Sequence, residues 1–432
     1  MTRRSLPARR SAGRNAALLA AGAGAALAAF NHARARRSER RHPPTGRLFE
    51  IDGVRVHVHI AGEGPPVVLL NGNGSMVQDW LVSGLFDRLR RAYRVIAIDR
   101  PGYGHTERRR DRVWTPYAQA ELVRRTLAHL GVEKPIVLGH SWGTIVALAL
   151  ALEHPETVRG LVLLSGYYFP TARLDVWAFA PPAIPILGDA MRYTVSPLLA
   201  RLMAPKIIRK LFEPIPVPPR FTRRFPLDLA LRPSQLKASA EDSAFMVPAA
   251  AALQKRYREL RLPVQILTGT ADRIVTPERQ SLRLVQSIEG SELTQLPGLG
   301  HMIHYAAHHE IAEAVERVAT AGEETDEADA LPRTAPLPRW VEARDGGLAR
   351  NRTGVQGFAV LCVTTPPRGR PGARAAHVRA VHLLLQRPSA LATAGGRPSP
   401  DLDARRALSE RPVSRSFAGS TFGRTTGPLR LA

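Results

Sequence analysis

Residues 137–150 read VLGHSWGTIVALAL and place Ser141 between Gly139 and Gly143, where an apolar run gives way to a helix-forming run. Glycines relieve crowding where a strand turns abruptly into a helix. The serine between them must accept a strained backbone, and strain of this kind usually persists where function uses it. A strand, G-x-S-x-G and a helix form the context of a nucleophile elbow. A serine that only caps a helix is the simpler alternative.

A serine hydroxyl is a poor nucleophile at neutral pH and needs a base, which in turn needs an acid to orient it. On a parallel sheet these groups follow in the order serine, acid, histidine, on loops at the carboxyl ends of strands. Asp272 lies in ILTGTADRIVTPE, and His301 lies in LTQLPGLGHMIHY after a glycine-rich turn. We therefore predict Ser141 as the nucleophile, His301 as the base and Asp272 as the acid.

Other titratable residues compete for these roles. Asp242 is a second carboxylate that could serve as the acid. His304, His308 and His309 fall within or near the helix expected after His301, where solvation or packing explains them. The ring of His140, inside the elbow, is expected to support the turn.

Attack of the serine on a carbonyl produces an oxyanion that needs two backbone donors. The amide of Trp142, directly after the nucleophile, supplies one. The second is expected from Asn73, in the loop NGNGS that follows the apolar run at residues 67–70. A plain glycine turn is consistent with the same letters.

The elements that must position these residues alternate between strands and helices. Val54, Val56, Val58 and Ile60 alternate with polar residues as in a half-buried strand. Continuous apolar runs at residues 67–70, 94–99, 136–139, 161–164 and 264–269 indicate buried parallel strands. Between them, residues 116–130 predict a helix with Thr115 as N-cap and Gly131 as its end. This pattern predicts an α/β fold with a mostly parallel, doubly wound sheet.

The alternation stops between residues 170 and 250, which are rich in proline and long apolar side chains. We interpret this segment as an inserted helical cap between core residues 43–169 and 251–322, because the strand pattern resumes at Val264. Helices that merely complete the core are the alternative. Apolar cap residues are candidates for an acyl pocket, although they fit ordinary cap packing equally well: Trp177, Phe179, Met203 and Phe212.

The net charge of +24 suggests nucleic acid or an anionic membrane, but it is concentrated at the two ends. Residues 1–42 carry +9 and residues 333–432 carry +12, which leaves +3 for residues 43–332. No basic stripe with interspersed aromatic residues follows the middle of the chain, so we expect no nucleic-acid partner. Binding of nucleic acid by the arginine-rich ends is the competing hypothesis. Residues 323–432, dominated by Arg, Pro, Gly and Ala, are expected to be disordered.

Residues 16–30 form an apolar run with arginine-rich flanks on both sides. The run is short for a bilayer span, and alanine and glycine contribute little transfer energy. We favour an uncleaved membrane anchor or surface-attached helix within residues 1–42. A cleaved signal peptide and a disordered basic arm are the alternatives.

Residues 47–319 resemble the α/β-hydrolase superfamily, of the type with an inserted helical cap. The resemblance lies in five segments that occur in order: LLNGNGS, IDRPGYGHTER, GHSWG, GTADRIV and GLGHMIHY. The family's first loop usually begins with His-Gly, whereas this chain has Asn71-Gly72. Relatives that open epoxides or cleave carbon–halogen bonds use an aspartate at the elbow, so Ser141 argues against both reactions.

The resemblance implies a serine hydrolase, whose relatives include carboxylesterases, lactonases, C–C bond hydrolases, perhydrolases and exopeptidases. An exopeptidase ranks lower because the cap offers no clear acidic cluster for a substrate amine. We predict cleavage of an apolar carboxylic ester or related acyl compound, with no metal or organic cofactor. A lactonase, a C–C bond hydrolase, a perhydrolase and a non-catalytic ligand-binding protein remain alternatives.

Overall fold

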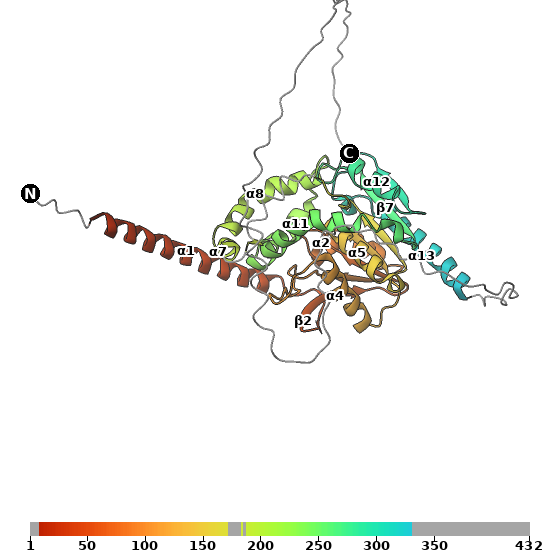
Figure 1. Ribbon diagram of the computed structural model, residues 1–432, viewed down its shortest axis with the longest axis horizontal. Helices are drawn as coiled ribbons and strands as arrows, with labels where there is room; N and C mark the ends of the chain where they lie inside the picture. Colours follow the sequence, from red (N-terminus) through yellow and green to blue (C-terminus); the bar gives the residue numbers. More distant parts are fainter. Residues whose placement is uncertain (1–7, 172–182, 185–186, 331–432) are drawn as a thin grey trace, which may run out of the picture. The chain divides into compact units, whose positions relative to one another are not determined.

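The computed structural model describes residues 8–171, 183–184 and 187–330, and the side chains of these from residue 13 to residue 322. Eight strands form one sheet in the order β1-β2-β4-β3-β5-β6-β7-β8 (Figure 1). Strand β2 is antiparallel to both of its neighbours, and all other pairs are parallel. The strands are β1 (Arg47–Ile51), β2 (Val54–Ala61), β3 (Pro66–Leu70), β4 (Arg94–Ile98), β5 (Ile136–His140), β6 (Gly160–Leu164), β7 (Val264–Gly269) and β8 (Glu292–Leu296).

Helices cover both faces of the sheet, as expected for a doubly wound fold. One face packs against α2 (Val77–Ser83), α3 (Leu85–Leu89) and α13 (His308–Ala330), and the other against α4 (Pro116–His129), α5 (Trp142–Glu153) and α12 (Ser281–Val285). The threonine predicted as N-cap of α4 does cap it, because the Thr115 side chain accepts from the Ala118 amide at 3.1 Å. Short 3-10 helices lie at Pro155–Thr157, Tyr257–Glu259, Pro277–Arg279 and Ile303–Tyr305.

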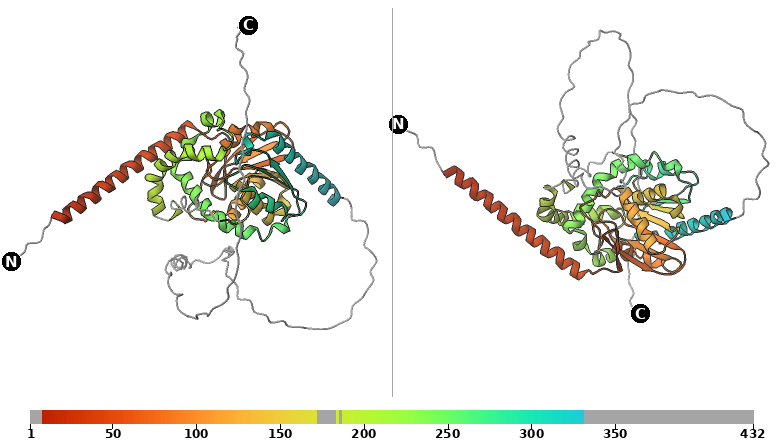
Figure 2. Two further views of the ribbon diagram at one scale, coloured as in Figure 1. Left: turned by 90° about the horizontal axis from the view of Figure 1, so that it is seen from above. Right: turned by 60° about the horizontal axis from the view of Figure 1, so that its bottom comes forward.

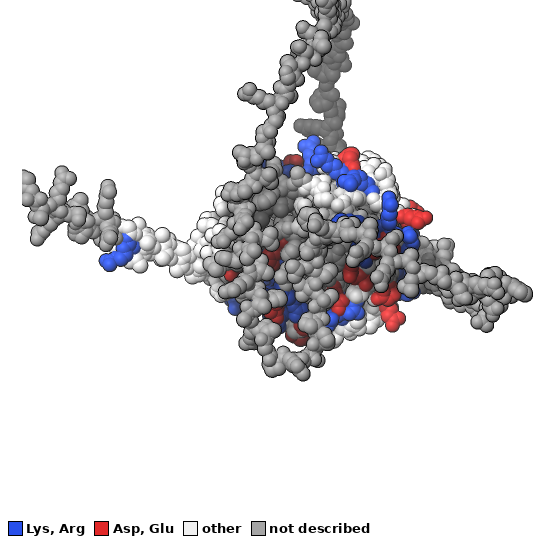
Figure 3. Space-filling view, in the orientation of Figure 1, with Lys and Arg blue, Asp and Glu red and all other residues white. Residues whose placement is uncertain are grey.

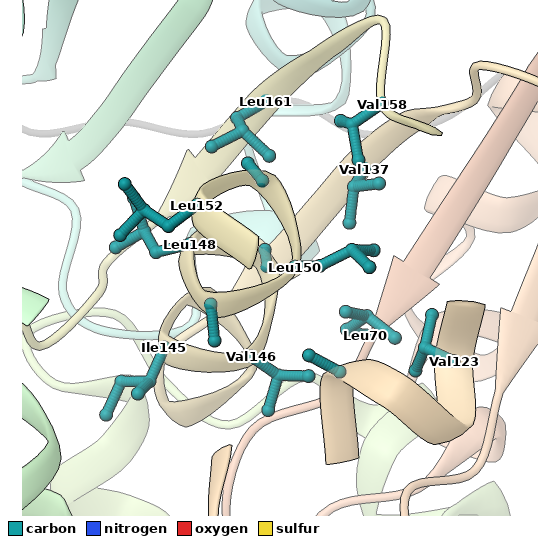
Figure 4. Packing of buried hydrophobic residues seen from close by; sticks show 14 of the residues in the cluster. Leu70, Val123, Val137, Ile145, Val146, Leu148, Leu150, Leu152, Val158 and Leu161 are labelled. Atoms are coloured by element: carbon teal, nitrogen blue, oxygen red, sulfur yellow. The ribbon is translucent and has the colours of Figure 1, made fainter. Parts of the chain in front are cut away.

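Helix α5 lies at the centre of the larger core. Eleven of its residues, from Trp142 to Leu152, are buried, so the helix is apolar on all sides. Figure 4 shows its leucine and valine side chains packed against Leu70, Val137 and Leu161, which come from three neighbouring strands. Burial of each such side chain contributes about 1.5–3 kcal/mol. This packing fixes the amino end of α5, where Ser141 lies.

The described part of the segment between β6 and β7 contains helices and no strand, in keeping with the predicted interruption of the strand pattern. Its described helices lie together beside the part that holds the sheet (Figure 2). They are α7 (Leu187–Tyr193), α8 (Val195–Phe212), α9 (Pro219–Arg224), α10 (Leu227–Ala230) and α11 (Pro233–Leu253). We call these helices the cap.

Both ends of the described chain are helical. Residues 8–41 form one helix, α1 (Ala8–Arg41), so this end is not irregular. Helix α13 runs to Ala330 and so includes residues 323–330, the first part of the segment expected to be disordered. The tail from residue 331 and Cys362 lie outside the described residues.

Helix α1 has an exposed apolar part and a docked polar part. Among the described helices, it carries the one stretch, Gly13–Arg41, that is long and apolar enough to cross a membrane. Its projecting part is mostly free of charged side chains (Figure 3). Its carboxyl-terminal part contacts α7, α10 and α11 of the cap, where Arg34 pairs with Asp228 at 3.3 Å and Glu39 pairs with Arg232 at 2.8 Å.

Candidate active site

The backbone at Ser141 is strained as the G-x-S-x-G pattern predicts. Ser141 has φ 51° and ψ −119°, a conformation that non-glycine residues rarely adopt. A Cβ on Gly143 would collide with the carbonyl oxygen of Leu70, and a Cβ on Gly139 would collide with the backbone of Gly143. The two glycines therefore allow α5 to begin directly against β3 and β5, with the serine at the corner between strand and helix.

Asp272 and His301 form a buried pair at the same edge of the sheet. Asp272 follows β7, and its Oδ2 lies 2.8 Å from Nδ1 of His301, which follows β8. The other carboxylate oxygen, Oδ1, accepts from the amides of Ile274 and Val275 at 2.8 and 2.9 Å. These bonds fix the carboxylate, which in turn holds the proton of His301 on Nδ1. The Nε2 atom is then the nitrogen that can accept a proton.

His140 connects the elbow to the histidine loop. Its Nε2 lies 3.1 Å from the backbone oxygen of His301, and the two rings are 5.0 Å apart between centroids. Burial, followed by the nearby charges of His304 and His301, lowers the pKa of His140 well below its ordinary value. A neutral His140 therefore donates from Nε2 to the backbone oxygen of His301, so its ring joins the elbow to another loop.

A second aspartate–histidine pair lies behind His140. Nε2 of His304 is 3.1 Å from Oδ2 of Asp79, and the Tyr305 hydroxyl donates to Asp79 Oδ1 at 2.6 Å. Burial raises the pKa of Asp79, but His304, Tyr305 and the Ser75 hydroxyl together hold it below its ordinary value. His304 is fully buried, 4.5 Å from His140 between ring centroids. This pair packs the histidine loop against α2.

Asp242 belongs to a buried ion pair and is not a partner of His301. Its Oδ2 lies 2.6 Å from Nη1 of Arg100, and both side chains are 0% exposed. Its other oxygen accepts from Gln119 at 3.1 Å, and its backbone oxygen accepts from the Trp142 indole at 2.9 Å. Tyr103 adds a bond to Oδ2 at 2.9 Å. Asp242 thus ties cap helix α11 to the core.

Arg100 supports the loop expected to supply one oxyanion donor. Its Nε donates to the oxygen of Asn71 at 2.8 Å, and its Nη2 donates to that of Gly72 at 3.0 Å. Its guanidinium also lies over the Trp142 ring, 4.6 Å from the centroid. All three guanidinium nitrogens are therefore engaged by the protein.

The side chain of Asn73 is held by the cap. Its Nδ2 donates to the Ser243 hydroxyl at 2.9 Å, and its Oδ1 accepts from Ser239 at 2.6 Å and from Tyr103 at 2.8 Å. These bonds orient the loop whose backbone is the predicted donor.

The predicted acyl-pocket residues have different positions. Trp177 and Phe179 lie outside the described residues. Met203 lies on the outer face of α8 and is 44% exposed, which does not support a role in a pocket. Phe212 is buried against Phe221 and Tyr305, in a cluster that includes Met302. Because Met302 directly follows His301, Phe212 lies close to the site.

The other two histidines considered as candidates for the base, His308 and His309, do not contact Asp272 or His140. His308 lies 3.0 Å from the backbone oxygen of His304 through Nε2, and exposed His309 pairs with Glu313 at 3.2 Å. Among the side chains that the structure describes, no group of three or more His, Cys, Asp or Glu is arranged to hold a metal ion.

Comparison with known proteins agrees with this fold. A sequence model of the alpha/beta hydrolase fold family matches residues 65–307. A 2-hydroxymuconate semialdehyde hydrolase of Pseudomonas putida is 29% identical over 293 residues, 67% of this chain and 97% of the relative. A 2-hydroxy-6-oxo-2,4-heptadienoate hydrolase of Pseudomonas putida is 31% identical over 276 residues, 60% of this chain and 90% of the relative.

Among solved structures, an esterase of Thermogutta terrifontis superposes with a TM-score of 0.51 at 21% identity. The match covers 64% of this chain and 99% of the esterase, and at this identity it supports the fold. The sheet order, the strained serine corner and the family match lead to one conclusion: this chain belongs to the alpha/beta hydrolase fold family.

Proposed function

We propose that this chain is a serine hydrolase that cleaves apolar carboxylic esters or related acyl compounds. The observation that carries the proposal is the buried pair of Asp272 and His301, 2.8 Å apart. His301 is linked to the strained serine corner through His140. An imidazole that a carboxylate holds in one orientation is the base that a serine nucleophile needs.

The proposed reaction has two halves. The Oγ of Ser141 attacks the substrate carbonyl while its proton passes to Nε2 of His301, and Asp272 stabilises the resulting imidazolium. The amides of Trp142 and Asn73 donate to the oxyanion of the tetrahedral intermediate. The intermediate expels the alcohol, which takes the proton from His301. Water then attacks the acyl-enzyme with the same base, releasing the acid and restoring the serine.

Hydrolysis of a C–C bond is the second candidate, because the substrates in the names of two relatives contain no ester bond that water could cleave. The substrate in the second name is a carboxylate, and a buried carboxylate needs a cationic partner. Arg100 is the guanidinium nearest the predicted oxyanion loop, and its three nitrogens already donate to protein groups. An uncharged ester needs no cationic partner in the site. This difference favours the ester.

We also propose that α1 attaches the protein to a membrane. Residues 16–30 are apolar or small on every side of the helix, which is typical of a lipid-facing segment. At 1.5 Å per residue, fifteen residues span about 22 Å, shorter than the ~30 Å hydrocarbon core. The exposed Leu18, Leu19 and Phe30 support insertion of this part into lipid.

The test uses the full-length chain in detergent micelles. A fluorophosphonate probe is expected to label the protein, and Ser141→Ala is expected to abolish labelling while leaving the circular dichroism spectrum unchanged. Turnover is then measured with p-nitrophenyl esters of increasing acyl length and with 2-hydroxy-6-oxo-2,4-heptadienoate. If the protein turned over the dienoate but none of the esters, C–C bond hydrolysis would replace the proposed ester hydrolysis. Labelling that persists in Ser141→Ala would refute the assigned nucleophile.

A further inference from the structure

Helix α8 presents an apolar face to solvent. Large apolar side chains recur at intervals of three and four residues along it, the spacing of one helix face, and all of them are exposed: Val195, Leu198, Leu199, Leu202, Met203 and Ile207. Leu202 reaches 78% exposure. The opposite face is buried at Ala204 and Phe212. Soluble monomers seldom leave a contiguous apolar patch of this kind uncovered.

The same exposed side becomes basic toward the carboxyl end of α8. After Pro205, the exposed residues include Lys206, Arg209 and Lys210. At 100° per residue these three side chains project along the line begun by Leu198 and Leu202. An apolar stripe that continues into cationic side chains is complementary to a bilayer with anionic headgroups.

This face meets the exposed apolar part of α1. Asn31 directly follows the apolar run, and its Nδ2 donates to the backbone oxygens of Tyr193 and Thr194 at 2.9 and 2.7 Å. These two residues directly precede α8. Phe30 on α1 and Val195 on α8 are both exposed beside this junction. The exposed apolar parts of the two helices therefore begin at the same junction.

We propose that the exposed face of α8 lies on the surface of the lipid bilayer into which α1 inserts. The six apolar side chains of α8 enter the interface, and Lys206, Arg209 and Lys210 contact anionic headgroups. This inference rests on the proposed attachment by α1 and adds a second contact that fixes the cap against the membrane.

The contact would bring the candidate active site close to the bilayer. Phe212, the last residue of α8, packs on Tyr305 with ring centroids 5.0 Å apart. The next residue, Glu213, places its backbone oxygen where a Cβ on Gly300 would collide with it. Gly300 precedes His301, so the helix on the membrane leads directly to the histidine loop. Apolar substrates dissolved in the bilayer would then need only a short path through the cap.

The experiment places a fluorescent probe on α8 of the full-length chain. Cys362 is the single cysteine, so Cys362→Ser allows a unique label at Leu202→Cys. The control label, Glu289→Cys, replaces a side chain that is 86% exposed and lies before β8, at the edge of the sheet opposite the site. Vesicles of phosphatidylcholine and phosphatidylglycerol carry brominated acyl chains as quenchers. The emission maximum of the label at residue 202 is expected to shift to shorter wavelength, and its intensity is expected to fall. The emission of the label at residue 289 is expected to remain unchanged.

A second measurement isolates the contribution of α8. Leu18→Glu/Leu19→Glu weakens insertion of α1, so that vesicle flotation depends more on the cap. Adding Leu198→Gln/Leu202→Gln is expected to lower the floated fraction about tenfold or more, because two large apolar side chains no longer enter lipid. Adding Glu289→Gln is expected to leave it unchanged.

The outcomes separate the two membrane proposals. Flotation without quenching at 202 would overturn the contact by α8 and leave attachment by α1 intact. Absence of flotation by the unmodified chain would overturn both. A blue shift at 202 without vesicles would show that α8 is covered by a second copy of the chain, which also overturns the bilayer contact.

Discussion

Nε2 of His140 lies 3.1 Å from the backbone oxygen of His301, so the residue before the predicted nucleophile holds the loop of the predicted base. His140 is buried and neutral, and its other ring nitrogen has no hydrogen-bond partner. One bond therefore joins the end of β5 to the loop after β8. The bond links the loops of the predicted nucleophile and the predicted base, which meet only in the folded state.

Replacement of His140 by alanine is expected to lower kcat/KM about 10²-fold, because the loop of His301 loses its anchor and a displacement of 1 Å is costly. His140→Gln keeps a donor and is expected to recover part of the loss. Ester hydrolysis is measured for both variants together with their urea unfolding. If the two variants had equal kcat/KM at equal unfolding free energy, His140 would not position the loop of His301.

Asp272→Asn is expected to reduce kcat about 10⁴-fold, because the amide does not hold His301 in the required tautomer. The carboxylate's bonds to two backbone amides are local to its own loop, so the unfolding free energy should change little. Steady-state kinetics and urea denaturation measure the two quantities separately. Wild-type kcat in this variant would show that another carboxylate orients the base.

The segments carrying the predicted triad could be found from sequence because each has a local signal. Ser141 lies two residues from a glycine on either side, Asp272 follows an apolar strand, and His301 follows a glycine-rich turn. The pairs Asp79–His304 and Arg100–Asp242 have no such signal, because their partners are 225 and 142 residues apart. Only the folded sheet and cap bring them together.

The cap shows a different limit of sequence reasoning. Apolar residues occur on both faces of α8, so periodicity alone does not separate the buried Phe212 from the exposed Met203. A core and a lipid-facing surface require the same residue types. The exposure of Met203 does not support the predicted pocket role, and its sequence pattern alone could not have shown this.

Asp242→Asn tests the alternative that sequence left open for the acid. The structure pairs Asp242 with Arg100 in full burial, so the variant leaves an uncompensated buried charge. A loss of about 3–5 kcal/mol in unfolding free energy is expected. Activity per folded molecule should fall far less than in Asp272→Asn. Urea denaturation combined with fluorophosphonate labelling measures both, and a stable but inactive variant would reassign Asp242 to the catalytic set.

The unfolding free energy is expected to fall as the pH drops below about 6.5, the value for an unperturbed histidine. Burial first, and then the charges of His304 and His301, lower the pKa of His140 in the folded state. The unfolded chain therefore binds a proton between the two pKa values while the folded chain does not, so stability is complete above pH 6.5 and is lost below it. Between pH 7.5 and 5.5 this residue contributes a loss of about 1.4 kcal/mol.

The half-buried His59, His105 and His308, whose pKa values are also lowered first by burial, add to this loss of unfolding free energy at low pH. Aspartates such as Asp79, whose pKa is lowered, act only at more acidic pH, because their unfolded value is about 4. His140→Gln should therefore reduce the loss between pH 7.5 and 5.5 by about 1.4 kcal/mol. The matched control is His309→Gln, which changes an exposed histidine. If both variants keep the full wild-type loss in urea titrations, protonation of His140 does not govern acid stability.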